Sequence, residues 1–164
     1  MTVAVKIKSG NKLKKALEKY ARQSASVSIG FFENAKYPAM PKEPAKGNPD
    51  IMRPAREEQY VAQVAFWNEY GTKTAPARPF FRTAIAENKD KWRQGFKKQI
   101  QKTKDIKKAL SLVGEVGKAD IQESIVKWTE PPNRPRTILY KGFNKPLEDS
   151  KQMLHSVSYE VSDK

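Results

Sequence analysis

The residue types that most often carry out catalysis are few in this chain and poorly placed. The 164-residue sequence has no cysteine and a single histidine, His155, which excludes thiolate chemistry and leaves no His/Cys cluster for a metal. His155 lies beside a predicted strand without a Ser-His-Asp order around it, so we expect a surface residue. Glu148 and Asp149 are adjacent and point in different directions, which makes them a poor acid–base pair. We therefore expect no enzyme and no cofactor.

One glycine-rich stretch, GEVGKAD at residues 114–120, resembles a phosphate-binding loop. Its glycine spacing differs from that motif, and no Ser or Thr follows Lys118. Helix packing is the better interpretation. Gly114 and Gly117 each cost a helix about 1 kcal/mol relative to alanine, so we expect the close approach of another helix or of a neighbouring chain to compensate.

The formal charge of +14 calls for an explanation. Two basic blocks, residues 6–22 and 89–108, carry much of it. A basic field is typical of nucleic-acid or acidic-protein partners, but lysines also keep helix faces in water, and few aromatic residues lie among them for base stacking. Both interpretations stay open. The lysines that would face DNA or an acidic partner are Lys97, Lys98, Lys102, Lys104, Lys107 and Lys108.

The stretch Asn68–Ile85, NEYGTKTAPARPFFRTAI, breaks the chain between two predicted helices. A glycine such as Gly71 accepts the backbone that ends a helix. Pro76 and Pro79 favour an extended backbone in the residues before them, and Phe80 with Phe81 can anchor the start of the next helix in the core. The stretch is interpreted as a rigid elbow.

Within this elbow, Glu69, Tyr70 and Arg78 lie close in sequence but have no catalytic partners. Arg78 is on a stiff, extended segment, where its guanidinium could serve as a fork for a carboxylate or carbonyl. The simplest interpretation is a connector between helices. The alternative is that the elbow presents Arg78 to a neighbouring subunit, with Arg78→Ala weakening assembly and leaving the monomer folded.

The N-terminal part is predicted to contain a strand at residues 2–8, a helix at 12–22 and a half-buried strand at 24–32. Residues 33–54 contain five prolines, which disfavour helix and central strand. This segment is interpreted as an extended arm that a neighbour orders. No apolar run approaches the roughly 20 residues that cross a bilayer, so we expect a soluble protein with no membrane partner.

Helices are predicted at residues 55–70, with Tyr60, Val61, Val64, Ala65 and Trp67/Asn68 at helical spacing, and from Phe81 onward. The stripe of the second helix is Phe81, Ile85, Trp92, Phe96 and Ile100. A third helix begins near Asp105, either capped by it or continuous with the second. Its stripe is Leu110, Val113, Gly117, Ile121, Ile125 and Trp128.

The last part is predicted to be an irregular connector, residues 130–152, and a closing strand at 157–161. A short helical turn is expected at Thr137–Lys141, and a second turn, capped by Asp149 or Ser150, through Leu154. The whole chain, residues 1–164, is expected to form one α+β domain. Its small, mostly antiparallel sheet combines N-terminal and C-terminal strands and packs against long helices, with long loops.

The order of motifs in VAFWNEYGT…APARPFFRTAI resembles the neck and tail-completion family of tailed bacteriophages, also described as virion morphogenesis or minor tail proteins. The second half is similar too, with a long helix ending in Trp128, the pair Lys141-Gly142, then Lys145-Pro146-Leu147 and SVSYEV. The family continues after that leucine with an acidic residue, threonine and glycine. This chain has Asp149-Ser150-Lys151 there, so its turn departs from the family.

The resemblance implies a structural ring component at the head-tail junction, found in the virion and in the host cytoplasm during assembly. Expected partners are copies of itself (a hexamer, with a dodecamer as the next candidate), head-side connector proteins, the tail terminator or tail tube, and phage DNA passing non-specifically through the lumen. The alternatives are a nucleic-acid-binding module and a tail-side protein needed for tail construction. Expected interface residues are Asn68, Glu69, Gly71, Pro76, Arg78, Pro79, Phe80, Lys145, Pro146 and Leu147.

Overall fold

The computed structural model describes residues 24–163, so the predicted strand at 2–8 and helix at 12–22 lie outside the described residues. Within that range the chain has an α+β fold with antiparallel pairs of strands and two long helices, as the sequence predicts. The elements are β1 (Ala25–Phe31), β2 (Lys36–Tyr37), β3 (Glu43–Ala45), β4 (Asn48–Arg53), β5 (Gln59–Tyr60), α2 (Val61–Tyr70), α3 (Phe80–Thr103), α4 (Ile106–Lys127), α5 (Pro135–Lys141), α6 (Gln152–His155) and β6 (Val157–Asp163).

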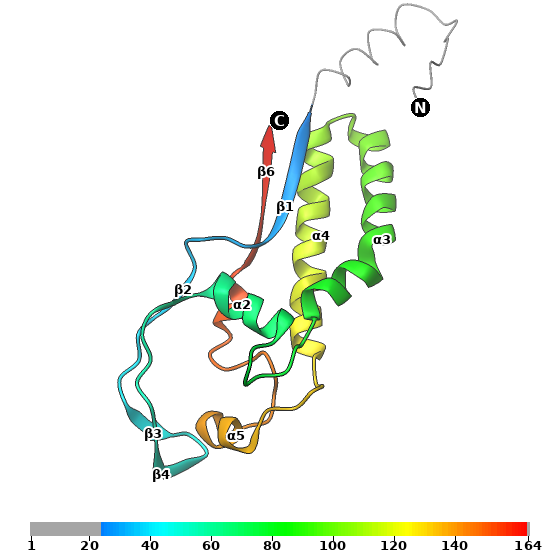
Figure 1. Cartoon of the computed structure of the whole chain (residues 1–164). Helices are drawn as coiled ribbons and strands as arrows, with labels where there is room; N and C mark the ends of the chain where they lie inside the picture. The colour runs from blue at the N-terminus through cyan, green and yellow to red at the C-terminus, as the bar shows by residue number, and fades with distance from the viewer. Residues whose placement is uncertain (1–23, 164) are drawn as a thin grey trace, which may run out of the picture.

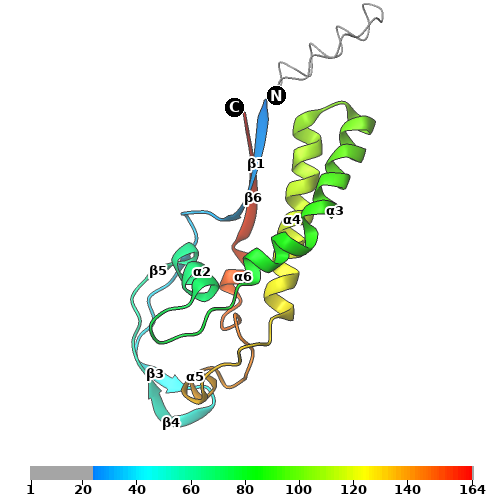
Figure 2. The same cartoon turned by 45° about the vertical axis from the view of Figure 1, so that its right-hand side comes forward.

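The first and last described strands form a long two-stranded sheet. β1 pairs antiparallel with β6, from Ala25 opposite Asp163 to Phe31 opposite Val157. The sheet runs along α4, and α3 lies on another side of α4 (Figures 1 and 2). The predicted pairing of N-terminal with C-terminal strands is therefore confirmed for β1 and β6.

The helices α3 and α4 form an antiparallel hairpin. Lys104 has a left-handed backbone (φ 53°) and ends α3, and the Asp105 carboxylate accepts a hydrogen bond from the Lys108 amide at 3.1 Å. Asp105 thus caps a separate helix, and the alternative of one continuous helix is wrong. Further along, the Asp120 carboxylate accepts from Lys91 Nζ (2.7 Å) and Trp92 Nε1 (2.6 Å), which joins the two helices.

The two glycines of α4 mark where the sheet approaches the helix. A Cβ on Gly114 would overlap the Tyr159 ring of β6, and one on Gly117 would overlap Ile29 Cδ1 of β1. The compensating partner is therefore the β1–β6 sheet. The predicted approach of another helix is confirmed only at Gly117, where a Cβ would also lie 3.6 Å from the Trp92 ring of α3. The closer contacts come from the sheet, because helical periodicity does not reveal which element covers a face.

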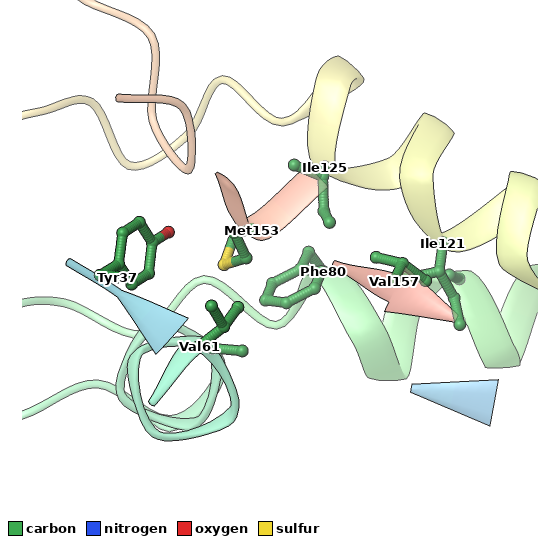
Figure 3. Close-up of a cluster of buried hydrophobic side chains, with 9 residues drawn as sticks. Tyr37, Val61, Phe80, Ile121, Ile125, Met153 and Val157 are labelled. Atoms are coloured by element: carbon green, nitrogen blue, oxygen red, sulfur yellow. The ribbon is translucent and has the colours of Figure 1, made fainter. Parts of the chain in front are cut away.

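The core lies where α2, the start of α3, the end of α4, α6 and the start of β6 meet (Figure 3). Phe80 is fully buried and packs edge-on against Phe31, with ring centroids 6.2 Å apart. Ser124 of α4 donates to the Phe80 carbonyl at 2.8 Å. The buried residues of this core are Tyr37, Val61, Ala65, Phe80, Ala84, Ile121, Ile125, Met153 and Val157.

Two details of the helix predictions are wrong. α2 starts at Val61 and not at residue 55, because Gln59 and Tyr60 pair with β2 and Arg56 forms a bridge with Met40. In α3 the fully buried positions are Phe80 and Ala84, whereas Ile85 is 38% exposed. The buried positions at the start of α3 are therefore shifted by one residue from the predicted stripe, because Phe80 and not Phe81 enters the core.

The proline-rich arm, residues 33–54, is more ordered than predicted. It has no helix and no central strand, as expected, but β3 and β4 form a two-stranded hairpin whose prolines lie on sheet edges. The hairpin tip contacts α5 of the same chain: the amide of Gly47 donates to the Leu139 carbonyl at 2.8 Å. The expectation that a neighbour must order the arm is therefore wrong. Backbone hydrogen bonds to α5 are long-range and leave no local signal.

The C-terminal connector contains the predicted turn as α5, which starts two residues earlier, at Pro135. α6 does not begin as predicted. Its N-cap is Lys151 in a left-handed conformation (φ 60°), without a side-chain cap. Asp149 instead accepts a hydrogen bond from Arg53 of β4 at 2.7 Å. Because its carboxylate forms this long-range ion pair, it does not cap α6. The closing strand is confirmed as β6, and His155 is exposed, as predicted.

Candidate assembly surface

The elbow between α2 and α3 is built by backbone geometry and local hydrogen bonds. Gly71 has φ 78° and ψ 175°, a region that only glycine adopts easily. A Cβ there would lie 2.8 Å from the Ala77 nitrogen. The Thr72 hydroxyl accepts from the Ala75 amide at 3.0 Å, and the Arg78 amide donates to the Asn68 carbonyl at 2.6 Å. Gly71 therefore ends the helix as predicted, and the elbow is a closed, hydrogen-bonded loop.

Glu69 has a capping role that the sequence analysis missed. Its side chain is 7% exposed, and its two carboxylate oxygens accept from the amides of Phe81 (2.9 Å) and Arg82 (3.1 Å) at the start of α3. Arg82 Nε adds an ion pair at 2.8 Å. Glu69 thus satisfies backbone donors that a helix N-terminus leaves free. Glu69 lies in the preceding helix, so no local capping pattern could have indicated it.

Arg78 is buried (7% exposed) and forms its hydrogen bonds inside the chain. Its Nε donates to the Pro131 carbonyl at 3.0 Å and its Nη2 to the Pro132 carbonyl at 3.1 Å. Burial lowers its pKa below the ordinary arginine value. The predicted fork is present, but the carbonyls belong to the connector after α4. The expectation that the guanidinium is available to a neighbour is wrong, because the fold brings residues 131–133 to the elbow.

The second part of the predicted interface, Lys145-Pro146-Leu147, lies against the same region. Pro146 is fully buried. The Lys145 carbonyl accepts from Lys141 Nζ at 2.6 Å, and burial lowers the pKa of Lys141. Leu147 and Arg78 line one cavity. The fold thus brings together the elbow and the Lys145-Pro146-Leu147 segment, the two motifs that carry the resemblance, and most of their contacts are within the same chain. Among the elbow residues, Pro76 remains exposed, whereas Pro79 is half-buried and Phe80 is in the core.

The most exposed aromatic surface lies on α2. Phe66, Tyr70 and Trp67 are 59%, 54% and 36% exposed, and the rings of Phe66 and Tyr70 are 4.7 Å apart. Next to them is a mainly apolar groove of about 250 Å³ between α2, β1 and the start of α3. The Arg82 guanidinium lies 4.7 Å from the centre of the Tyr70 ring, at the edge of this groove. We call Phe66, Trp67, Tyr70 and this groove the aromatic face.

The composition of α2 contains a signal for the aromatic face. Seven of the ten residues of α2 are apolar, and they occur on all sides of the helix. Such a helix is normally buried all round. Helical spacing alone groups Trp67 with Val61 and Ala65, but only Val61 and Ala65 are buried in the core. The remaining apolar residues leave α2 with a face that the monomer does not cover.

The six candidate lysines form a separate group. Lys97, Lys98, Lys102, Lys104, Lys107 and Lys108 are all exposed. They lie toward the end of the α3–α4 hairpin that points away from α5 and the arm (Figure 1). Lys107 pairs with Asp163 at 2.8 Å and Lys108 with Asp105 at 3.8 Å. We call this group the basic tip. It is distant from the elbow and the aromatic face.

The described residues contain no group of three or more His, Cys, Asp or Glu side chains that could hold a metal ion. Over the same residues, no helix is both long and apolar enough to cross a membrane. Comparison with protein-family models, with curated proteins and with solved structures finds no match for this chain.

Proposed function

We propose that this chain is a structural subunit of a ring at the head-tail junction of a tailed bacteriophage. The order of motifs around the elbow and the Lys145-Pro146-Leu147 segment supports the assignment to this class of protein. The fold is consistent with a scaffold protein, since its buried polar side chains, such as Glu69 and Arg78, bind backbone groups of the same chain.

The aromatic face is the observation that carries the proposal. Large exposed apolar groups that lie together on a surface are typical of protein–protein interfaces, and tyrosine, tryptophan and phenylalanine are enriched in interface cores. Identical subunits that join by two different patches form a ring when the rotation between neighbours closes, and an open filament when it does not. In the proposed ring, the aromatic face of one subunit packs against another surface of the next subunit. A hexamer is the first expectation and a dodecamer the second.

Replacing both Phe66 and Tyr70 with serine is expected to disrupt the ring while the monomer stays folded, because both rings are more than half exposed. Interface aromatics that act as binding hot spots each contribute about 2 kcal/mol or more. For the two residues together the association constant should therefore fall by a factor of about 10³. Sedimentation velocity or light scattering at several protein concentrations gives the oligomeric state.

Leu112→Ser is the matched control, since Leu112 of α4 is also a large apolar residue and is 45% exposed. It should leave assembly unchanged. A wild-type chain that is monomeric at all concentrations, and that is missing from purified virions, would contradict the proposed function. Imaging of phage particles assembled without the protein distinguishes a joining role from a tail-side role. Filled heads and finished tails left unjoined indicate a joining role, whereas absent or overlong tails indicate a tail-side protein.

A second candidate function, a nucleic-acid-binding module, is favoured by the basic tip. Each phosphate contacted would add about 0.9 to the slope of log K against log salt. Changing four tip lysines to glutamine should lower that slope by about 3 to 4. The matched control changes four other exposed lysines. DNA binding without a salt slope, or equal effects of both variants, would remove this candidate. The tip set is Lys97, Lys98, Lys102 and Lys104; the control set is Lys42, Lys46, Lys73 and Lys151.

A further inference from the structure

A cavity of about 240 Å³ lies between the arm, α2, the elbow and the C-terminal connector. The segments around it are far apart in the sequence, so only the fold brings them together. Its charged and polar lining is Tyr37, Arg53, Arg56, Asn68, Arg78, Asn133, Thr137, Tyr140, Lys141, Glu148 and Asp149.

The lining carries more positive than negative charge. Its cations are Arg53, Arg56, Arg78 and Lys141, and its carboxylates are Glu148 and Asp149. Arg53 Nη2 already pairs with Asp149 at 2.7 Å. Within residues 24–163 the other three cations have no carboxylate within ion-pair distance. A buried charge is costly unless another charge or a ligand compensates it.

Several hydrogen-bond donors in the same lining lack acceptors. Arg56 Nε and Asn133 Nδ2 are buried and have no hydrogen-bond partner in the described chain, and Asn133 as a whole is only 9% exposed. Lys141 Nζ donates to the Lys145 carbonyl and has two further N–H groups. Buried donors are normally satisfied by protein, water or ligand. Two buried donors without an acceptor and three cations without a carboxylate partner thus belong to residues that line one cavity. Arg56 and Lys141 also lie over the rings of Tyr37 and Phe143, 5.0 and 4.8 Å from the ring centres, contacts that leave both positive charges without a counter-ion.

The pKa values agree with this charge imbalance. Burial lowers the pKa of Lys141, and the nearby Arg78 and Arg53 lower it further, while Asp149 and Glu148 oppose the effect. Burial also lowers the pKa of Arg78. Both positive charges are therefore less favourable here than in water, and a bound anion would stabilise them.

We propose that this cavity binds a compact oxyanion of the phosphate class. A liquid-water molecule occupies about 30 Å³, so a phosphate-sized group fits in the cavity together with some water. Phosphate offers four oxygen acceptors for donors that come from three separate segments, whereas a carboxylate offers two. Its negative charge would compensate Arg56, Arg78 and Lys141. The site does not depend on ring assembly and so is independent of the proposed function.

The bound anion would connect three segments that are far apart in the sequence. Arg56 lies between β4 and β5, just after the arm, Arg78 lies in the elbow, and Lys141 lies in α5. A single ligand between them would fix the arm and the connector relative to α2. Thermal unfolding should therefore respond to the anion.

Inorganic phosphate is the probe, compared with sodium chloride at equal ionic strength. At a phosphate concentration about 100 times the Kd, we expect Tm to rise by about 5 to 10 °C. Isothermal titration should give one phosphate per chain. Equal Tm values in phosphate and chloride, or several equivalent phosphate sites per chain, would overturn the proposal. A rise in acetate as large as in phosphate would overturn the assignment to the phosphate class.

Two variants test whether the cavity is the binding site. Lys141→Met and Arg56→Gln each remove a charge from the lining and should lose most of the phosphate-dependent rise in Tm. Lys97→Met removes the same charge from the basic tip and should keep the wild-type rise. Circular dichroism identifies which variants are folded, and one folded variant is sufficient. If a folded Lys141→Met or Arg56→Gln variant keeps the full phosphate-dependent rise in Tm, or if Lys97→Met loses it, phosphate binds elsewhere. If neither cavity variant folds, the titration of the wild type decides, and a value other than one phosphate per chain overturns the proposal.

Discussion

Arg78→Ala is expected to lower the free energy of unfolding of the monomer by about 3 kcal/mol. The substitution removes hydrogen bonds from a charged donor to the carbonyls of Pro131 and Pro132, and each such bond contributes about 1.5 to 3 kcal/mol. Urea unfolding followed by circular dichroism measures the effect, at several protein concentrations, because assembly would add to the apparent stability.

The matched control is Arg93→Ala. The side chain of Arg93 is 77% exposed and pairs only with the exposed Asp90, so its removal should change stability by less than about 0.5 kcal/mol. Arg78→Lys keeps the charge but not the planar fork and should lie between wild type and Arg78→Ala. A fully stable Arg78→Ala monomer with impaired assembly would contradict our interpretation and favour a contact between subunits.

Glu69→Ala is expected to lower the free energy of unfolding by about 2 to 3 kcal/mol. Its carboxylate accepts from two amides at the N-terminus of the 24-residue helix α3. Loss of an N-terminal cap costs about 0.5 to 2 kcal/mol. The expected loss lies at or above the top of that range, because Glu69 is buried and charged and accepts from two amides at once. The ion pair to Arg82 adds little, because Arg82 is 55% exposed.

Hydrogen exchange of the Phe81 and Arg82 amides should locate the effect of Glu69→Ala at the start of α3. Glu69→Gln keeps one acceptor oxygen and should lose less stability. Glu57→Ala is the control, since Glu57 is exposed. Protection of both amides that is unchanged in Glu69→Ala would mean that the carboxylate is not their acceptor.

These expectations change the role of the elbow. The residues that make this stretch distinctive are engaged mainly in the fold of the monomer: Gly71 turns the chain, Glu69 caps α3, and Arg78 fixes the connector. A surface for another subunit is then to be sought beside the elbow, on the aromatic face, and not at Arg78. The elbow sets the angle at which α2 presents that face.

The sequence predicted the elements that depend on local patterns. Alternation gave β1 and β6, and helical spacing gave α3, α4 and the existence of α2. The capping preference of Asp105 and the conformational freedom of Gly71 gave two of the helix ends. The low content of catalytic residue types led to the expectation of a protein that is not an enzyme. Each of these depends on residues within a few positions of one another.

Only the tertiary structure decided the partners of the polar side chains. Arg78 could have bound a neighbour, but its guanidinium donates to the carbonyls of Pro131 and Pro132, in the connector that follows α4. Asp149 could have capped α6, but its carboxylate accepts a hydrogen bond from Arg53 of the arm. The hydrogen-bonding capacity of a side chain is determined by its type, whereas its partner is determined by which distant segment the core brings within about 3 Å. The fold therefore decided which residues stabilise the monomer and which remain exposed to a partner.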